Sequence, residues 1–332
     1  MLKKALLVVA ALSLAACSST TATPVATTAP VVTTGPVATT APVVTTGPAA
    51  TTDLSKITIA YSGYSTSNTY WNILGKAAAA EAKAKGIKFV DVTATVNDSA
   101  TQLQAVNSEL TQKPSAIIIG SVDNRVWGDT IAKAKAAGIP ILAVDTGIAD
   151  PYISALIQTD NQGAGGLIGD LICKTVKKGT VLVLGGTVGA QSGDARKNGV
   201  EAKIKACGLT DNGQYGDWDS VKDVSIATAT MASTPDLAAI FVPHSDGAAA
   251  VAKAVADKGL SGTIGVYGFD GSAAELTAIL AGSETASIHQ DNVTMGKTIV
   301  DDAITLLGGG TVEKTVLIPG IVIDKSNAAS FQ

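Results

Sequence analysis

The residues of this sequence that could do chemistry are carboxylates, amides and hydroxyls that directly follow short apolar runs. In order along the chain they are Ser62, Asp123, Asn124, Asp145, Thr146, His244, Ser245, Asp270 and Gln290. As a set, these groups both donate and accept hydrogen bonds, and we expect them to carry little net charge. That mixture suits a neutral polyhydroxylated ligand better than a phosphate or a hydrophobic molecule.

Motifs for catalysis, cofactors and metals do not reach their required spacing. Residues 296–298 read Gly-Lys-Thr like the end of a phosphate loop, but the first glycine of that motif is replaced by Asp291. The glycine run 163–169 has Ile168 where a dinucleotide turn needs its third glycine, so we predict close packing of a helix start against a sheet. The spacing of the two histidines, His244 and His289, does not indicate which residue would be a third metal ligand. We predict no catalytic residue, no metal and no cofactor.

The elements that must position the polar residues alternate between apolar runs and amphipathic stretches. Alternation of strand and helix with glycine-rich turns is typical of doubly wound parallel sheets, and about 280 residues of it exceed one core, so we predict two such α/β lobes. Glycines at 86, 138 and 259 are predicted helix stops. Strands are predicted at 57–61, 88–92, 116–120, 139–144, 155–158, 180–184, 238–242, 263–268, 286–289 and 317–322, and helices at 71–85, 101–112, 126–137, 166–176, 196–206 and 248–258.

Composition excludes several classes of protein. The 332 residues carry 24 basic and 28 acidic side chains, for a formal charge of −4, and no Lys/Arg patch, so nucleic acid is not an expected partner. Three cysteines without a Cys-x-x-Cys pair argue against a zinc or redox motif. No apolar run reaches the length of a membrane-spanning helix.

The N-terminus predicts export. A basic segment, residues 1–4, precedes twelve apolar residues and the sequence Leu14-Ala15-Ala16-Cys17. That ending resembles the bacterial lipobox, so we predict a signal peptide over 1–16 and lipidation of Cys17. An ordinary cleaved signal peptide is the alternative. The expected location is extracytoplasmic, with the membrane contacted through the lipid anchor only.

Residues 17–52 read as a disordered tether. After Cys17 the tract is rich in Thr, Ala, Val and Pro and contains no charge, and residues 26–37 are repeated almost unchanged at 38–49. A twelve-residue unit with two prolines is too short for a solenoid and favours extended backbone. We expect this segment to hold the folded part away from a membrane surface.

From about Lys56 to the C-terminus the sequence resembles the ribose-type (type I) periplasmic sugar-binding proteins that serve ABC importers. Each marker is short, but their order over some 270 residues is specific. The markers are Asn68-Thr69-Tyr70-Trp71, Gly138-Ile139-Pro140-Ile141 before Asp145, Thr159-Asp160-Asn161 with Gly165-Gly166, Ala195-Arg196 with Gly199, Gly268-Phe269-Asp270-Gly271, and Ala286-Ser287-Ile288-His289-Gln290.

The resemblance implies roles for individual residues. Three aromatic residues would pack on the faces of a sugar, and charged and amide groups would bind its hydroxyls. Two departures alter the donor–acceptor pattern, so the resemblance does not name the sugar: Thr146 stands where the family often has arginine, and His244 where it often has asparagine. The complete predicted ligand set is Asn68, Tyr70, Trp71, Asp123, Asp145, Thr146, Arg196, Trp218, His244, Asp270 and Gln290.

The family pattern also implies two lobes joined by three crossovers. The first would comprise 53–159 with 291–319, and the second 160–290 with 320–332. The expected function is a monomeric solute-binding lipoprotein that captures a neutral sugar or related polyol and delivers it to an ABC permease. A ligand sensor of the same fold, which hands a sugar or a furanosyl signal such as an autoinducer to a receptor, is the alternative. A repressor would need an N-terminal helix-turn-helix, and an enzyme a catalytic pair in the cleft.

Cys173 and Cys207 are the two cysteines of the predicted folded part. Both lie near the C-terminal ends of predicted helices, 166–176 and 196–206, and an exported compartment permits oxidation. A disulfide between them is one possibility. Helices that flank a strand often lie on opposite faces of a sheet, and a free buried cysteine is a common small core residue, so the two thiols could also stay unpaired.

Overall fold

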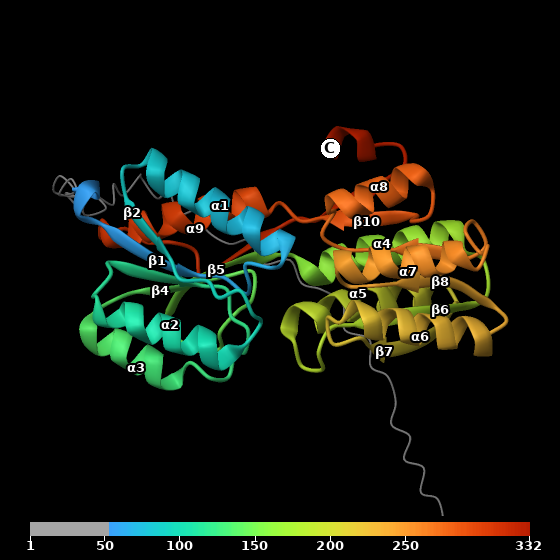
Figure 1. Ribbon diagram of the computed structural model, residues 1–332, viewed down its shortest axis with the longest axis horizontal. Helices are drawn as coiled ribbons and strands as arrows, with labels where there is room; N and C mark the ends of the chain where they lie inside the picture. The colour runs from blue at the N-terminus through green and yellow to red at the C-terminus, as the bar shows by residue number, and fades with distance from the viewer. Residues whose placement is uncertain (1–52) are drawn as a thin grey trace, which may run out of the picture. The chain divides into compact units, whose positions relative to one another are not determined.

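Short apolar segments form two six-stranded sheets in the computed structural model, which describes residues 53–332 (Figure 1). The first sheet has the order β11-β5-β4-β3-β1-β2 and the second β12-β10-β9-β8-β6-β7. The first contains β1 (Thr58–Ser62), β2 (Lys88–Asp91), β3 (Ala116–Ile119), β4 (Ile141–Val144), β5 (Ile153–Thr159) and β11 (Thr315–Ile318). The second contains β6 (Thr180–Gly185), β7 (Thr210–Tyr215), β8 (Leu237–Phe241), β9 (Gly265–Tyr267), β10 (Ala286–His289) and β12 (Ile321–Asp324).

All strand pairs are parallel except β10 with β12, which run antiparallel. The central strands β3, β4 and β6 are buried along their whole length, as parallel strands covered on both faces must be. The predicted α/β class with two parallel-sheet lobes is therefore confirmed.

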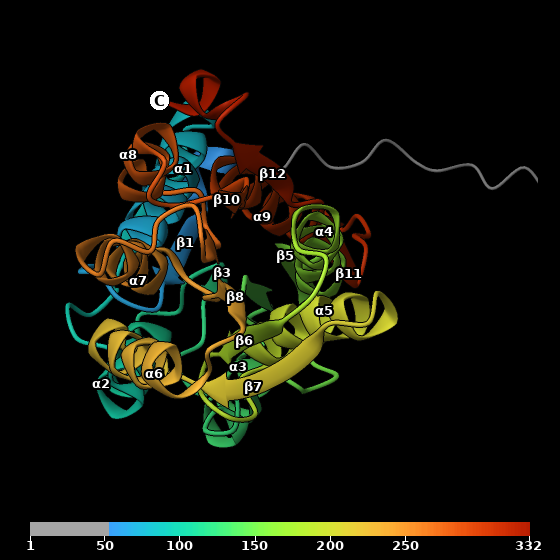
Figure 2. The same cartoon turned by 90° about the vertical axis from the view of Figure 1, so that its right-hand side faces the viewer.

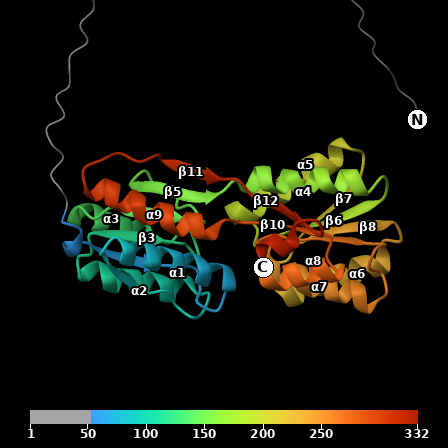
Figure 3. The ribbon, with the colours of Figure 1, turned by 90° about the horizontal axis from the view of Figure 1, so that it is seen from above.

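Helices cover both faces of each sheet. In the first lobe α1 (Thr69–Ala84) packs against α9 (Asn292–Leu307), and α2 (Ser99–Thr111) against α3 (Gly128–Ala137). In the second lobe α4 (Asn161–Thr175) packs against α5 (Gln191–Ala206), while α7 (Ser245–Asp257) contacts α6 (Ser220–Ser233) and α8 (Ala273–Ala281). Figure 3 shows α4 and α5 on one side of the second sheet and α6, α7 and α8 on the other. Each face has its own apolar cluster.

The chain passes between the two sheets three times. It leaves the first sheet after β5, returns between β10 and α9, and crosses again between β11 and β12. The third crossing corrects one prediction, because the single strand expected at 317–322 is two strands in different sheets. Pro319 and Gly320 separate them, and a Cβ on Gly320 would lie 2.7 Å from Ile288 Cγ2.

The other nine predicted strands lie within two residues of observed ones, but β7 was not predicted. Its sequence, Thr-Asp-Asn-Gly-Gln-Tyr, has no apolar run. It forms the edge of the second sheet and none of its residues is fully buried, so no hydrophobic pattern was required there. The predicted helix stop at Gly138 is confirmed, since this residue is the left-handed C-cap of α3.

The glycine run 163–169 serves close packing, but of two helices and not of a helix start on a sheet. A Cβ on Gly165 would lie 2.2 Å from the carbonyl oxygen of Arg196, and one on Gly199 would lie 2.3 Å from that of Gln162. These glycines therefore let α4 and α5 approach until their backbones touch. Figure 2 also shows the two helices side by side.

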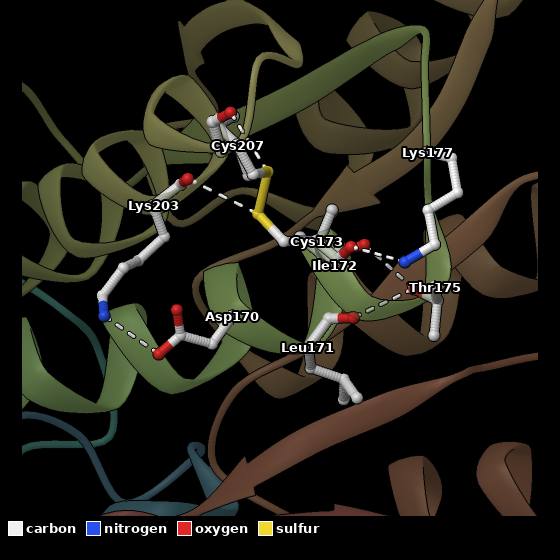
Figure 4. The surroundings of a disulfide bond; sticks show 9 residues. Asp170, Leu171, Ile172, Cys173, Thr175, Lys177, Lys203 and Cys207 are labelled. Atoms are coloured by element: carbon white, nitrogen blue, oxygen red, sulfur yellow. Dashed lines mark hydrogen bonds and ion pairs between the residues drawn. A yellow bond between two sulfur atoms is a disulfide. The ribbon is translucent and has the colours of Figure 1, made fainter.

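A disulfide ties the C-terminal ends of the same two helices together. Cys173 and Cys207 are joined by an S–S bond of 2.07 Å, with their Cα atoms 6.1 Å apart (Figure 4). The helices flank β6 on the same face of the sheet, so their ends meet. Nearby, Lys203 of α5 forms an ion pair of 2.9 Å with Asp170 of α4.

Among residues 53–332, every helix is too short or too polar to cross a lipid bilayer. The predicted signal peptide, the lipidated Cys17 and the tether of 17–52 lie outside the described residues.

Candidate functional site

A cavity of about 720 Å³ is lined by residues from both lobes. Its volume falls in the range of small-molecule sites. Most of its walls come from segments that follow the carboxyl ends of strands, where open parallel sheets bind ligands. The structure brings together at this cleft all eleven residues of the predicted ligand set: Asn68, Tyr70, Trp71, Asp123, Asp145, Thr146, Arg196, Trp218, His244, Asp270 and Gln290.

The first lobe supplies an aromatic wall. Trp71 lies over Gly120, which directly follows β3, and a Cβ at that glycine would lie 2.2 Å from Trp71 Cζ3. Tyr64 stacks on Trp71 with ring centroids 5.9 Å apart and an interplanar angle of 13°. Asn68 is the N-cap of α1, and its Oδ1 accepts a hydrogen bond of 3.2 Å from Trp71 N. Asn68 therefore fixes the helix start that carries the aromatic pair Tyr70 and Trp71.

Asp145 is a buried carboxylate on the same wall. It follows β4 with a left-handed φ of 61°, and only 6% of its surface is exposed. Tyr70 Oη donates a hydrogen bond of 2.7 Å to its Oδ1, and Thr146 Oγ1 donates one of 3.1 Å to its Oδ2. Burial, together with the Asp145 carboxylate, raises the pKa of Tyr70 well above its usual range, so Tyr70 stays a donor.

Arg196 organises the polar wall of the second lobe. It is 4% exposed, and its guanidinium lies 3.9 Å from the centroid of the Phe269 ring. Its Nε donates to Asn161 Oδ1 at 2.7 Å, and its Nη1 donates to the carbonyl of Pro243 at 2.8 Å. Its Nη2 donates to Gln290 Oε1 at 3.1 Å. Arginine keeps its charge when buried, and these acceptors with the aromatic face hold it rigidly.

Asp270 is the anionic partner of Arg196, with 3.5 Å between Oδ1 and Nη1. Its Oδ1 accepts a 2.6 Å hydrogen bond from Gln290 Nε2, and its Oδ2 accepts one of 3.1 Å from Ser245 N. Burial raises the pKa of Asp270, while Arg196 acts in the opposite direction. Its φ of 100° is rare for a residue other than glycine, and such backbone strain concentrates at functional positions.

Trp218 forms the aromatic wall of the second lobe. Gly186, directly after β6, makes room for it, because a Cβ there would lie 2.2 Å from Trp218 Cε2. Its ring meets His244 edge-on, with centroids 5.8 Å apart. His244 Nε2 lies 2.7 Å from Asp223 Oδ2, and its Nδ1 accepts from Gly247 N at 3.4 Å. Nδ1 is thus the acceptor and Nε2 the donor, so His244 is held as the N-cap of α7 as well as lining the cleft.

Asp123 is ion-paired with an arginine two residues along the chain. Arg125 Nε and Nη2 donate hydrogen bonds of 2.9 and 2.8 Å to its two carboxylate oxygens. These bonds lower the pKa of Asp123 to about 2. Arg125 and Tyr64 also line the cleft, and neither residue was predicted. A hydrophobic pattern does not reveal either residue, because both stand in loops.

The residues that line the cleft carry a negative formal charge. Its lining includes two arginines, Arg125 and Arg196, against five aspartates, which gives a formal charge of −3 with histidine neutral. The aspartates are Asp98, Asp123, Asp145, Asp246 and Asp270. The same described part of the chain holds no group of three or more His, Cys, Asp or Glu side chains arranged for a metal ion.

Contacts at the crossovers link the site to the hinge between the lobes. Thr159 Oγ1, at the end of β5, donates a 2.6 Å hydrogen bond to Gln290 Oε1. Asn292 Nδ2, at the start of α9, donates to the carbonyl of Tyr70 at 3.2 Å. His289 lies against Phe331, with ring centroids 5.1 Å apart. Gln290 therefore connects the Arg196–Asp270 pair to the connecting segments.

Comparison with known proteins identifies the family. A model described as "Periplasmic binding protein domain" matches residues 59–311, most of the chain. The chain belongs to the periplasmic binding protein family. Like its relatives, it is therefore a solute-binding protein that works outside the cytoplasm and not an enzyme.

Individual relatives support the assignment. The chain is 28% identical over 267 residues to the ribose import binding protein RbsB of Bacillus subtilis, which covers 80% of this chain and 86% of that protein. An ABC transporter solute-binding protein from Agrobacterium vitis, bound to alpha-D-tagatopyranose, is 27% identical with a TM-score of 0.77, covering 82% of this chain and 96% of that one. One from Actinobacillus succinogenes with D-allose has a TM-score of 0.78 at 23% identity, covering 83% and 100%, and supports the fold alone.

Proposed function

We propose that this periplasmic binding protein captures a monosaccharide or related polyol between its lobes and delivers it to an ABC permease as a monomer. The observation that carries the proposal is the pair of tryptophans, Trp71 and Trp218, which line one cavity from opposite lobes with hydroxyl-binding groups between them. Flat aromatic rings suit the CH-rich faces of a sugar, and polar groups suit its hydroxylated rim.

A ligand that touches both lobes favours their closure. Arg196, Asp270 and Gln290 form one hydrogen-bonded network in the second lobe, whereas Asp145 belongs to the first. A ligand that bonds to both groups at once stabilises the state in which they are near each other. The lobe boundaries that we propose are 53–159 with 291–319 and 160–290 with 320–332.

A binding screen tests the proposal. Pentoses, hexoses, polyols and nucleosides are to be compared by thermal shift, and the hits measured by calorimetry. Trp218→Ala should weaken binding by about 2–4 kcal/mol, as loss of a central aromatic contact does. Tyr215→Ala is the matched control, because Tyr215 is an aromatic residue on neighbouring β7 that does not line the cleft. If no sugar or polyol binds, or if both variants bind equally well, the proposal is wrong.

We further propose that Cys17 carries the lipid that anchors the mature protein to the cell membrane. The protein should then partition into the detergent phase, and Cys17→Ala should be soluble or unprocessed. Equal partitioning of the two proteins would exclude the anchor. Uptake of the labelled ligand by cells, with and without the protein, separates delivery to a permease from the sensor alternative.

A further inference from the structure

One carboxylate of the cleft is buried without a cation. Two of the five aspartates that line the cleft are ion-paired, Asp123 with Arg125 and Asp270 with Arg196. Asp98 and Asp246 are exposed, so water screens them. Asp145 is more than nine-tenths buried, and within residues 53–332 it forms no ion pair.

The partners of Asp145 leave its charge in place. It receives hydrogen bonds from two hydroxyls, those of Tyr70 and Thr146. A carboxylate has about four acceptor positions, so each oxygen retains one that a ligand can use. Hydroxyl donors lessen the cost of burying the charge but do not neutralise it. That cost rises when the lobes close and water leaves the cleft.

We propose that the ligand supplies the missing cation, so that the protein binds an amino sugar or amino polyol whose ammonium group contacts Asp145. This inference rests on the proposed function and narrows its ligand class. A hydroxyl of a neutral sugar would donate one hydrogen bond to Asp145 and leave the charge unbalanced. A hydrogen bond from either donor to the carboxylate is charge-assisted, but only an ammonium also brings the positive charge that balances Asp145.

Matched ligand pairs test the inference. The 2-, 3-, 4- and 6-amino derivatives of D-glucose, D-galactose and D-allose are to be compared by calorimetry with their parent sugars. At least one amine should bind about tenfold or more tightly than its parent at pH 6, a difference of about 1.4 kcal/mol. Its advantage should disappear when the pH is raised above the pKa of the ligand's own amine, where the parent sugar shows no change.

Two variants with the same change of charge locate the contact. Asp145→Asn should abolish the amine's advantage and should fold, because asparagine tolerates a left-handed φ as well as aspartate does. Asp129→Asn should keep the advantage, because Asp129 is exposed on α3 and does not line the cleft.

The outcomes separate this inference from the proposed function. If parent sugars bind and no amine binds more tightly, or if the amine's advantage survives in Asp145→Asn, the ligand is neutral at this carboxylate and the inference is wrong. If neither parents nor amines bind, the inference and the proposed sugar-binding function both fail.

Discussion

Two buried carboxyl groups in and after helix α8 predict an unusual dependence of stability on pH. Glu275 is 0% exposed and Glu284 2% exposed. They meet at Gly268, where an added Cβ would lie 2.2 Å from Glu275 Oε1 and 2.5 Å from Glu284 Oε1. Ser272 N and Ser287 Oγ donate to Glu275, whereas among the described residues no N–H or hydroxyl group donates to either Glu284 oxygen. Two carboxylates this close cannot both be charged, so a proton is held between them.

The direction of the effect follows from the pKa values. Burial, with Asp270 nearby, raises the pKa of Glu275 to about 8, and burial with Glu275 nearby raises that of Glu284. The folded protein therefore holds more protons than the unfolded chain above pH 4.5. The pair's contribution to the free energy of unfolding is greatest below pH 4.5 and falls as the pH rises toward about 8. The slope is up to about 1.4 kcal/mol per pH unit for one proton.

Glu284→Gln should weaken this dependence, because it removes the carboxyl group of Glu284, whereas burial and Asp270 still raise the pKa of Glu275. Its amide can donate to Glu275 without carrying charge, so the variant should exceed the parent in stability by about 2–3 kcal/mol at pH 8. That corresponds to roughly 5 °C in melting temperature for a chain of this size. The measurement is urea denaturation from pH 5 to 9 with the disulfide intact. Below pH 6.5 the half-buried His289, whose pKa is lowered by desolvation, acts in the opposite direction. The difference in stability between the two proteins is therefore the quantity to compare.

Glu313→Gln is the control, because Glu313 is exposed and the change is chemically the same. Its pH profile should remain parallel to that of the parent. Parallel profiles for Glu284→Gln, or a Glu284→Gln protein that is less stable than the parent at pH 8, would refute the shared proton.

Two further predictions concern the cleft wall and the disulfide. Gly186→Ala should weaken ligand binding about tenfold or more, because its Cβ would occupy the place of Trp218. Gly128→Ala is the control and should bind normally, because no atom lies within 4 Å of its Cβ. The affinities are to be measured by calorimetry with a sugar found in the binding screen, and equal affinities would show that the position of the Trp218 ring is unimportant. Cys173→Ser should lower the free energy of unfolding by roughly 3–4 kcal/mol, since Cys173 and Cys207 close a loop of 34 residues; two titratable thiols in the denatured, unreduced parent protein would contradict the bridge.

Sequence alone determined the pattern of elements. Strands such as 116–119 and 180–185 are covered on both faces of a parallel sheet, so nearly every residue in them must be apolar. Such a run can be recognised from the sequence alone. Strand β7 was missed because an edge strand needs no such run. The candidate site was visible for a related reason, since residues that follow strands in such folds meet at one edge.

Only the tertiary structure decided how the polar groups are paired. The sequence contains Asp123, Asp145 and Asp270 in equivalent settings after strands, yet one is bound by a neighbouring arginine, one by an arginine 74 positions away, and one by hydroxyls alone. Ion pairing depends on distances of a few ångströms between side chains from separate elements, and periodicity carries no information about them. The energetic cost of each charge depends on how deeply it is buried, and that burial is set by the packing of the lobes and not by the sequence pattern.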